Sequence, residues 1–286
     1  MAFSVELGLV FALATALTSV VGFLYKHRGA VAAPPVTWRR PLRSSLALFR
    51  SRWYTIGVLV ATASWGLHVT ALSLAPISLV QSVIAGGLVL LTVVADRAFG
   101  FDVTRREWIG VGLTATGLAV LAATLEGDAA SRHSSYHALT LGLYVGLAAA
   151  AGIAVAALAR ASSRAGVLLG ASAGLLWGAS DVSIKALSGH LDAGAGVVHP
   201  LAAVVAGASL LGLLVSARSL QLGDAVPVIA VTSAAANVCT IASGPLVFAE
   251  PVPSDTAGLV LRVTAFALVV LAAALTPGPV RVVDPA

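Results

Sequence analysis

Long runs of apolar residues alternate along this chain with short segments that hold most of its charges. Each run is close to the roughly 20 residues that an α-helix needs to cross a bilayer. The pattern predicts an all-α polytopic membrane protein, because helices satisfy their own backbone hydrogen bonds in lipid. We place nine transmembrane spans at 4–25, 54–73, 77–96, 109–125, 137–159, 166–187, 195–216, 224–249 and 256–275.

The composition supports one integral membrane domain over residues 1–286. The chain is 58% hydrophobic and 10% charged, whereas a soluble domain carries about 25% charged residues. Its net charge of +5 would suit a nucleic-acid partner, but the basic residues lie in alternate loops between apolar runs. That distribution excludes nucleic acid and indicates membrane orientation instead.

The basic residues also predict the topology, because Lys and Arg concentrate in cytoplasmic loops. The N-terminus is then outside, the C-terminal tail 276–286 is cytoplasmic, and the location is the cell membrane. Glu6 is the only charge early in the first span, so that span is retained rather than a signal peptide. Fourteen of the 17 Lys and Arg residues fall in 26–53, 97–108, 160–165, 217–223 and the tail.

The first cytoplasmic loop, 26–53, holds seven of these basic residues and no acid. After Pro41, apolar residues recur at helical spacing at Leu42, Leu46, Phe49 and Trp53. This predicts a helix that lies on the cytoplasmic leaflet. The alternative is a solvated loop whose arginines only fix the orientation.

The sixth span carries glycine at every fourth position: Gly166, Gly170, Gly174 and Gly178. Residues four apart share one helix face, so the four form a smooth ridge. Such small-residue ridges let helices approach closely in lipid. The partner is either another helix of this chain or a second copy of it in a homodimer.

Beside the ridge runs a stripe of Trp177, Asp181 and Lys185. A carboxylate inside an apolar span is costly, which makes Asp181 a candidate for a functional site. The alternative is that Asp181 and Lys185 only neutralise each other across one helical turn.

A weak internal repeat relates the two halves of the chain. Residues 71–74 (Ala-Leu-Ser-Leu) resemble residues 217–220 (Ala-Arg-Ser-Leu), and at the same offset Val80 matches Val226. Apolar spans then end in Ala95-Asp96 and Ala249-Glu250; we interpret both acids as boundary charges. The first repeat is 1–125, the second is 166–275, and span 137–159 links them. An offset of five spans inverts the repeat, an arrangement typical of secondary transporters.

These motifs resemble the drug/metabolite transporter superfamily, which includes the EamA-type carriers. Their order and spacing are most similar to its nine-span branch, the NIPA-type magnesium transporters. The resemblance covers nearly the whole chain and implies a transporter, with magnesium as one alternative substrate. It rests on Tyr25–Gly29, Ala71–Pro76 with Leu79–Gln81, Asp96 before Trp108–Gly110, Trp177–Gly178 through Lys185, and Asp224–Pro227 running to Phe248–Glu250.

Two departures argue against magnesium. The NIPA-type pattern has a carboxylate in the second span shortly before the Ala-Pro motif, whereas residues 64–68 here read Ser-Trp-Gly-Leu-His. That pattern also has proline after the Val-Gln pair, where this chain has Ser82.

Few polar side chains in the spans need a partner from elsewhere, since Ser and Thr can bond their own helix. We predict a binding site built by Asp181, Lys185, Gln81, Asn237, His68 and Trp177. Asp181 would carry a proton or coordinate a cation such as Mg²⁺, which keeps several waters and takes one or two carboxylates. For a zwitterionic metabolite, Lys185 would bind the carboxylate and Trp177 or Trp65 would stack. The alternative for His68 and both tryptophans is packing.

Residues 170–174 match the G-x-S-x-G pattern of serine hydrolases. That pattern marks a nucleophile only on a strained strand–turn–helix, so we expect no enzyme and no cofactor. Mg²⁺ or H⁺ would be a transported or coupling ion.

The sequence thus predicts a secondary transporter of a small solute that works by alternating access. Its partners would be a small molecule or ion, the bilayer and, in a homodimer, a second copy. The alternatives are a NIPA-like magnesium transporter and a non-transporting accessory or anchoring protein.

Overall fold

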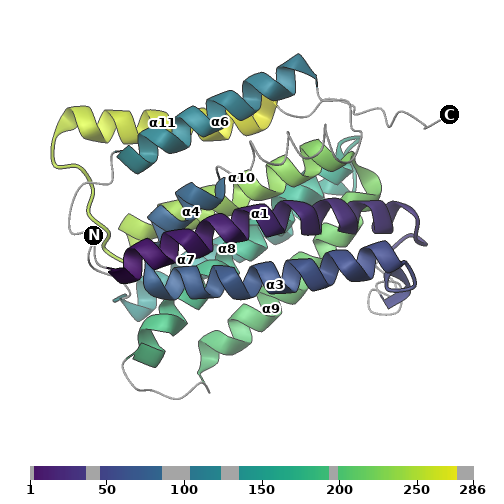
Figure 1. The fold of residues 1–286 in the computed structure, drawn as a ribbon, viewed down its shortest axis with the longest axis horizontal. Helices are drawn as coiled ribbons and strands as arrows, with labels where there is room; N and C mark the ends of the chain where they lie inside the picture. Colours follow the sequence, from purple (N-terminus) through teal and green to yellow (C-terminus); the bar gives the residue numbers. More distant parts are fainter. Residues whose placement is uncertain (1–2, 37–45, 86–103, 124–134, 193–198, 276–286) are drawn as a thin grey trace.

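The computed structural model of the chain describes residues 3–36, 46–85, 104–123, 135–192 and 199–275. Within these ranges the long elements are all α-helices, and none of the described residues forms a strand (Figure 1). The helices are α1 (Phe3–Val31), α3 (Arg52–Leu74), α4 (Ile77–Ala85), α6 (Arg105–Ala123), α7 (Ala138–Ala159), α8 (Ala165–Asp192), α9 (Pro200–Leu222), α10 (Ala225–Val247) and α11 (Thr256–Leu275).

Six of the described helices, α1, α3, α7, α8, α9 and α10, are long and apolar enough to cross a membrane. The chain is therefore a multi-pass membrane protein, as its hydrophobic pattern predicts. Helix α4 begins at Ile77 as expected, and the rest of the predicted span 77–96 lies outside the described residues.

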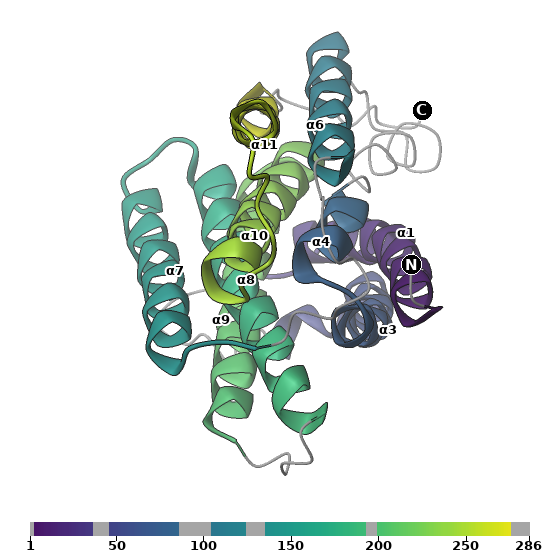
Figure 2. The same ribbon diagram turned by 90° about the vertical axis from the view of Figure 1, so that its left-hand side faces the viewer.

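Helix α8 lies at the centre of the structure, where it packs against α7, α9 and α10 and also meets α3. Helix α1 packs against α3 and also contacts α4 and α9. Helices α6 and α11 pack on each other at one side of the structure, where α6 also contacts α4 and α11 contacts α10 (Figures 1 and 2). Side chains on α8 can therefore contact partners from several helices at once.

The predicted boundaries of the seventh span are wrong. The seventh span was placed at 195–216 with a cytoplasmic loop at 217–223, but α9 runs from Pro200 to Leu222. It starts at Pro200 because proline suits the first helical position, and the His199 ring accepts a hydrogen bond from Leu201 N. It ends only at Gly223, since no residue from 217 to 222 breaks a helix.

The predicted interfacial helix is also interrupted. Residues 37–45 lie outside the described part of the chain, residues 46–48 are helical, and 49–51 form a turn before α3. Trp53 consequently belongs to α3, where its ring stacks on Tyr25 with the centroids 5.5 Å apart. A single helical face through Phe49 and Trp53 is therefore wrong.

The glycine ridge of α8 packs within the chain. Gly170 faces Val228 and Thr232 of α10, Gly174 faces Thr232 and Ala235, and Gly178 faces Cys239. A Cβ atom on Gly174 would overlap the carbonyl oxygen of Thr232, which is backbone and cannot move aside cheaply. The ridge thus brings α8 and α10 into close contact, and this answers the question that the sequence left open.

Substituting Gly174 tests this packing. We expect Gly174→Ala to separate α8 from α10 and to destabilise the protein by about 1–3 kcal/mol, the usual cost of overpacking. The measurement is thermal unfolding of the detergent-purified protein. Gly146→Ala on α7 is the matched control, because a Cβ there meets nothing within 4 Å. An equal loss of stability in both variants would contradict the ridge contact.

Candidate functional site

Three of the predicted site residues meet inside the protein, and we call them the Asp181 cluster. They are Asp181 of α8, His68 of α3 and Gln81 of α4. His68 Nε2 lies 3.1 Å from Asp181 Oδ1. Gln81 Nε2 lies 3.5 Å from Asp181 Oδ2 and 3.4 Å from His68 Nε2. Side chains from three helices thus converge on one carboxylate.

The geometry of His68 indicates where its proton is. Its Nδ1 atom is buried and has no hydrogen-bond partner in the described part of the chain. A charged imidazole would leave an N–H unsatisfied at Nδ1, whereas the neutral ring with its proton on Nε2 leaves only an acceptor there. We therefore assign Nε2–H donating to an ionised Asp181, in a neutral imidazole.

Asp181 is the most accessible member of the cluster. Its side chain is 15% exposed, against 10% for His68, and Gln81 is only 2% exposed. A carboxylate accepts about four hydrogen bonds, and His68 and Gln81 donate one to each oxygen. Asp181 therefore has acceptor capacity left for a bound solute.

The cluster lies next to a tight turn between α3 and α4. Pro76 disfavours helical geometry at the preceding residue, so Ala75 is extended, with φ −139° and ψ 161°. Helix α4 begins again at Ile77. The turn leaves carbonyls at the end of α3 and N–H groups at the start of α4 to be satisfied by other parts of the chain.

Lys185 satisfies the end of α3. Its ammonium, completely buried, donates to the carbonyl oxygens of Leu72 at 2.9 Å and Ala75 at 2.8 Å. A cation is favourable here because the C-terminal end of a helix carries partial negative charge. The predicted neutralisation of Asp181 by Lys185 is thus replaced by another arrangement, in which His68 contacts Asp181 and Lys185 binds the turn.

Glu250 satisfies the start of α4. Its Oε1 accepts from Ile77 N at 2.8 Å and from Ser78 N at 3.4 Å, and the residue is only 4% exposed. A carboxylate is the complementary charge for a helix N-terminus. The interpretation of Glu250 as a boundary charge is therefore wrong: it is a buried cap.

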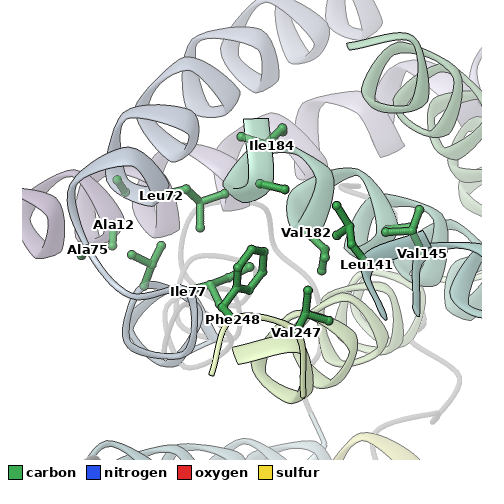
Figure 3. Close-up of a cluster of buried hydrophobic side chains, with 14 of the residues drawn as sticks. Ala12, Leu72, Ala75, Ile77, Leu141, Val145, Val182, Ile184, Val247 and Phe248 are labelled. Carbon is green, nitrogen blue, oxygen red and sulfur yellow. The ribbon is translucent and has the colours of Figure 1, made fainter. Parts of the chain in front are cut away.

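Helix α10 also binds the start of α4. Pro245 has no N–H, so the carbonyl of Ile241, four residues earlier, lacks its usual backbone donor. Ser78 Oγ donates to this oxygen at 3.2 Å. Gly244 lies against Ser78 and the Glu250 carboxylate, where a Cβ would overlap both. The turn is thus held by α8, by α10 and by the segment that follows α10; part of the apolar core around it is drawn in Figure 3.

The remaining predicted site residues lie elsewhere. The Trp177 indole donates to the carbonyl of Ser209 at 3.4 Å and meets the Phe23 ring edge-on, 5.7 Å between centroids. Asn237 is buried on α10, and its side chain makes no hydrogen bond to a described residue. Trp65 is 48% exposed and faces outward, so it does not line the cluster.

Two other sequence features have packing roles. Ser172, at the centre of the G-x-S-x-G match, donates to the carbonyl of Gly152 at 2.7 Å and joins α8 to α7. Ser64, in the region where the NIPA-type pattern has an acid, donates to the carbonyl of Thr15 at 3.1 Å and joins α3 to α1.

Sequence reasoning missed three buried charges, Glu250, Lys26 and Arg262, of which Arg262 donates to the carbonyl of Pro251 at 2.9 Å. The Ala-Pro turn leaves buried N–H groups that require an acceptor. That requirement is the sequence signal that could have indicated a capping role for Glu250. Lys26 was counted in the cytoplasmic loop, but α1 continues to Val31, and Lys26 is only 3% exposed.

Substitutions of Glu250 test its role as a cap. Glu250→Ala leaves the Ile77 and Ser78 N–H groups buried without an acceptor, at about 1–3 kcal/mol for each. Glu250→Gln keeps a carbonyl acceptor, so we expect a smaller loss of thermal stability. Glu6→Ala, at an exposed carboxylate, is the control. Equal losses in Glu250→Ala and Glu6→Ala would contradict the capping role.

Comparison with known proteins adds one relative. No family model matches the chain, and no solved structure matches it. The probable magnesium transporter NIPA9 of Arabidopsis thaliana is 24% identical over 267 residues, which cover 89% of this chain and 77% of that protein. The chain thus resembles a NIPA-type transporter over most of its length, as its motifs predict.

Proposed function

We propose that this chain is a secondary transporter of a small polar solute, which binds at the Asp181 cluster. The observation that carries the proposal is the contact of Asp181 with His68 and Gln81, 3.1 and 3.5 Å away. Polar groups inside a membrane protein are costly and mark solute pathways. An accessory or anchoring protein needs no such convergence of polar side chains from three helices.

Two matching turns support an inverted repeat. Helices α3 and α9 each have 23 residues, and each is followed by an extended residue with nearly equal torsions. These residues are Ala75 (φ −139°, ψ 161°) and Gly223 (φ −141°, ψ 160°). The torsions pair Ala75 with Gly223. This pairing is shifted by two residues from the sequence repeat, which matches residues 71–74 with residues 217–220.

The first helix of each half contacts the turn of the other half. Lys185 of α8 binds the Ala75 carbonyl, and His27 of α1 is hydrogen-bonded to the backbone of Gly223. This reciprocity is what two inverted repeats would produce. Alternating access between them, with nine spans and the N-terminus outside the cell membrane, is part of the proposal.

The chemistry of the cluster suits a solute that donates hydrogen bonds or carries a positive group. Asp181 offers an ionised carboxylate, Gln81 offers an amide, and the neutral His68 orients the acid. H⁺ as the coupling ion belongs to the same proposal, because an aspartate beside a histidine can hold or release a proton.

Magnesium is the second candidate, favoured by the name of the Arabidopsis relative. The described residues contain no group of three or more His, Cys, Asp or Glu side chains able to hold a metal ion. Mg²⁺ would therefore bind largely hydrated, with Asp181 as its one carboxylate in the cluster.

Ligand-dependent stability tests the proposal. Purified wild-type protein would be heated with Mg²⁺, other divalent cations, amino acids and common metabolites, and proteoliposome uptake would be measured for every stabilising ligand. We expect one solute class to raise the melting temperature. Asp181→Asn should weaken its binding about 10-fold or more, since it removes a charged acceptor.

Glu6→Gln is the matched control, because it makes the same carboxylate-to-amide change at an exposed position. It should leave binding unchanged. Stabilisation by Mg²⁺ alone, lost in Asp181→Asn, would select the magnesium transporter. If no ligand stabilises the protein and none is taken up, that result would contradict transport and favour an accessory protein.

A further inference from the structure

A further buried charge, Lys26, lies between the helices of the two halves. Lys26 of α1 is 3% exposed, and its ammonium lies over two aromatic rings. Its Nζ atom is 4.0 Å from the centroid of Phe23 and 5.4 Å from that of Trp177. One ring belongs to α1 and the other to α8, so the ammonium sits where the first half of the chain meets the second.

Lys26 has no acidic or hydrogen-bonding partner among the residues that the structure describes. Lys185, equally buried, binds two backbone carbonyls. A buried ammonium normally has a counter-ion or carbonyl acceptors, because the loss of hydration is otherwise uncompensated. Aromatic rings return only part of that loss.

The position of Lys26 is not that of a snorkelling side chain. Arg28, two residues later, is exposed and lies over Trp53, with Cζ 4.3 Å from the centroid. This is the usual arrangement for a basic residue at the end of a membrane helix. Lys26 instead keeps its charge inside, next to Trp177.

We infer that Lys26 binds an anionic group, such as a carboxylate, of the solute that the protein transports. Phe23 and Trp177 would contact the part of the solute next to that group. The inference rests on the proposed transport function and adds a substrate class to it: organic anions or zwitterions rather than free dications, which the ammonium would repel.

Trp177 connects this ammonium with the Asp181 cluster. Trp177 and Asp181 are four residues apart on α8, about 6 Å along the helix axis. A solute held by Lys26 against Trp177 would therefore have Asp181 one helical turn further along α8. A zwitterion would have an anionic group for Lys26 and a cationic group for Asp181, whereas a simple carboxylate would bind Lys26 alone.

The first experiment needs no ligand. Lys26→Met keeps the length and apolar stem of the side chain but removes the charge. We expect the melting temperature of the unliganded variant to equal or exceed that of the wild type, because a buried ammonium kept for ligand binding destabilises the folded protein when no ligand is bound. Arg28→Met, which also removes a cation from a tryptophan ring, is the control. A clear loss of stability in Lys26→Met alone would mean that the ammonium has a structural role, and would overturn the inference.

The second experiment uses matched probes: phenylalanine with phenylalaninamide, leucine with leucinamide, benzoate with methyl benzoate, and inorganic phosphate. Stabilisation and proteoliposome uptake would be measured for wild type, Lys26→Met, Lys26→Arg and Arg28→Met. We expect an acid to bind better than its amide or ester. That preference should fall about 10- to 100-fold in Lys26→Met, persist in Arg28→Met and recover partly in Lys26→Arg.

The outcomes separate the inference from the proposed function. Preference for amino acids over benzoate would identify a zwitterion, and the reverse a simple carboxylate. Equal binding and uptake of an acid and its amide or ester, or binding and uptake unchanged in Lys26→Met, would overturn the inference but would not contradict transport. If no solute in this set or in the wider panel is bound or taken up, that result would contradict both the inference and the proposed function.

Discussion

The arrangement around the Asp181 cluster depends on how the turn at Ala75-Pro76 is held. Proline ends one helix and starts another, which leaves carbonyls and N–H groups facing the interior. Lys185 binds the carbonyls at 2.8 and 2.9 Å, and Glu250 accepts from the N–H groups. Each charge matches the dipole of the helix end that it meets. Because both come from the second half of the chain, they also fix the first half against it.

This contact constrains any movement between the halves. Separating Lys185 from the end of α3 would remove the donor from two carbonyls, and separating Glu250 would remove the acceptor from two N–H groups. A transport cycle must therefore either pivot about the turn with these bonds intact or admit water that replaces them. Small-residue contacts such as Gly174 against Thr232 keep α8 and α10 together, so these two helices are expected to move as one body.

Hydrophobic length and periodicity predict the helices well, because a membrane span must be apolar and about 20 residues long. They place the end of α9 less well, since residues 217 to 222 include Arg218, Ser219 and Gln221 and yet all six are compatible with a helix. For the site, the sequence indicates that His68, Gln81 and Asp181 need partners, yet not which ones. The stripe on α8 suggested Lys185 for Asp181 because spacing along one helix is visible in a sequence, whereas contacts between α8 and α3 are not.

The buried charges also limit what the interior can bind. Lys185 and Glu250 bind the turn, and the charged groups of the described residues that we propose for a solute are Lys26 and Asp181, which have opposite sign. A solute site with one acid and one ammonium would give little net attraction to a dication. A sequence about one quarter identical to a magnesium transporter can keep the helices and the turn while its binding groups change. Ser64, in the region where the NIPA-type pattern has a carboxylate, fits such a change, because its hydroxyl joins α3 to α1.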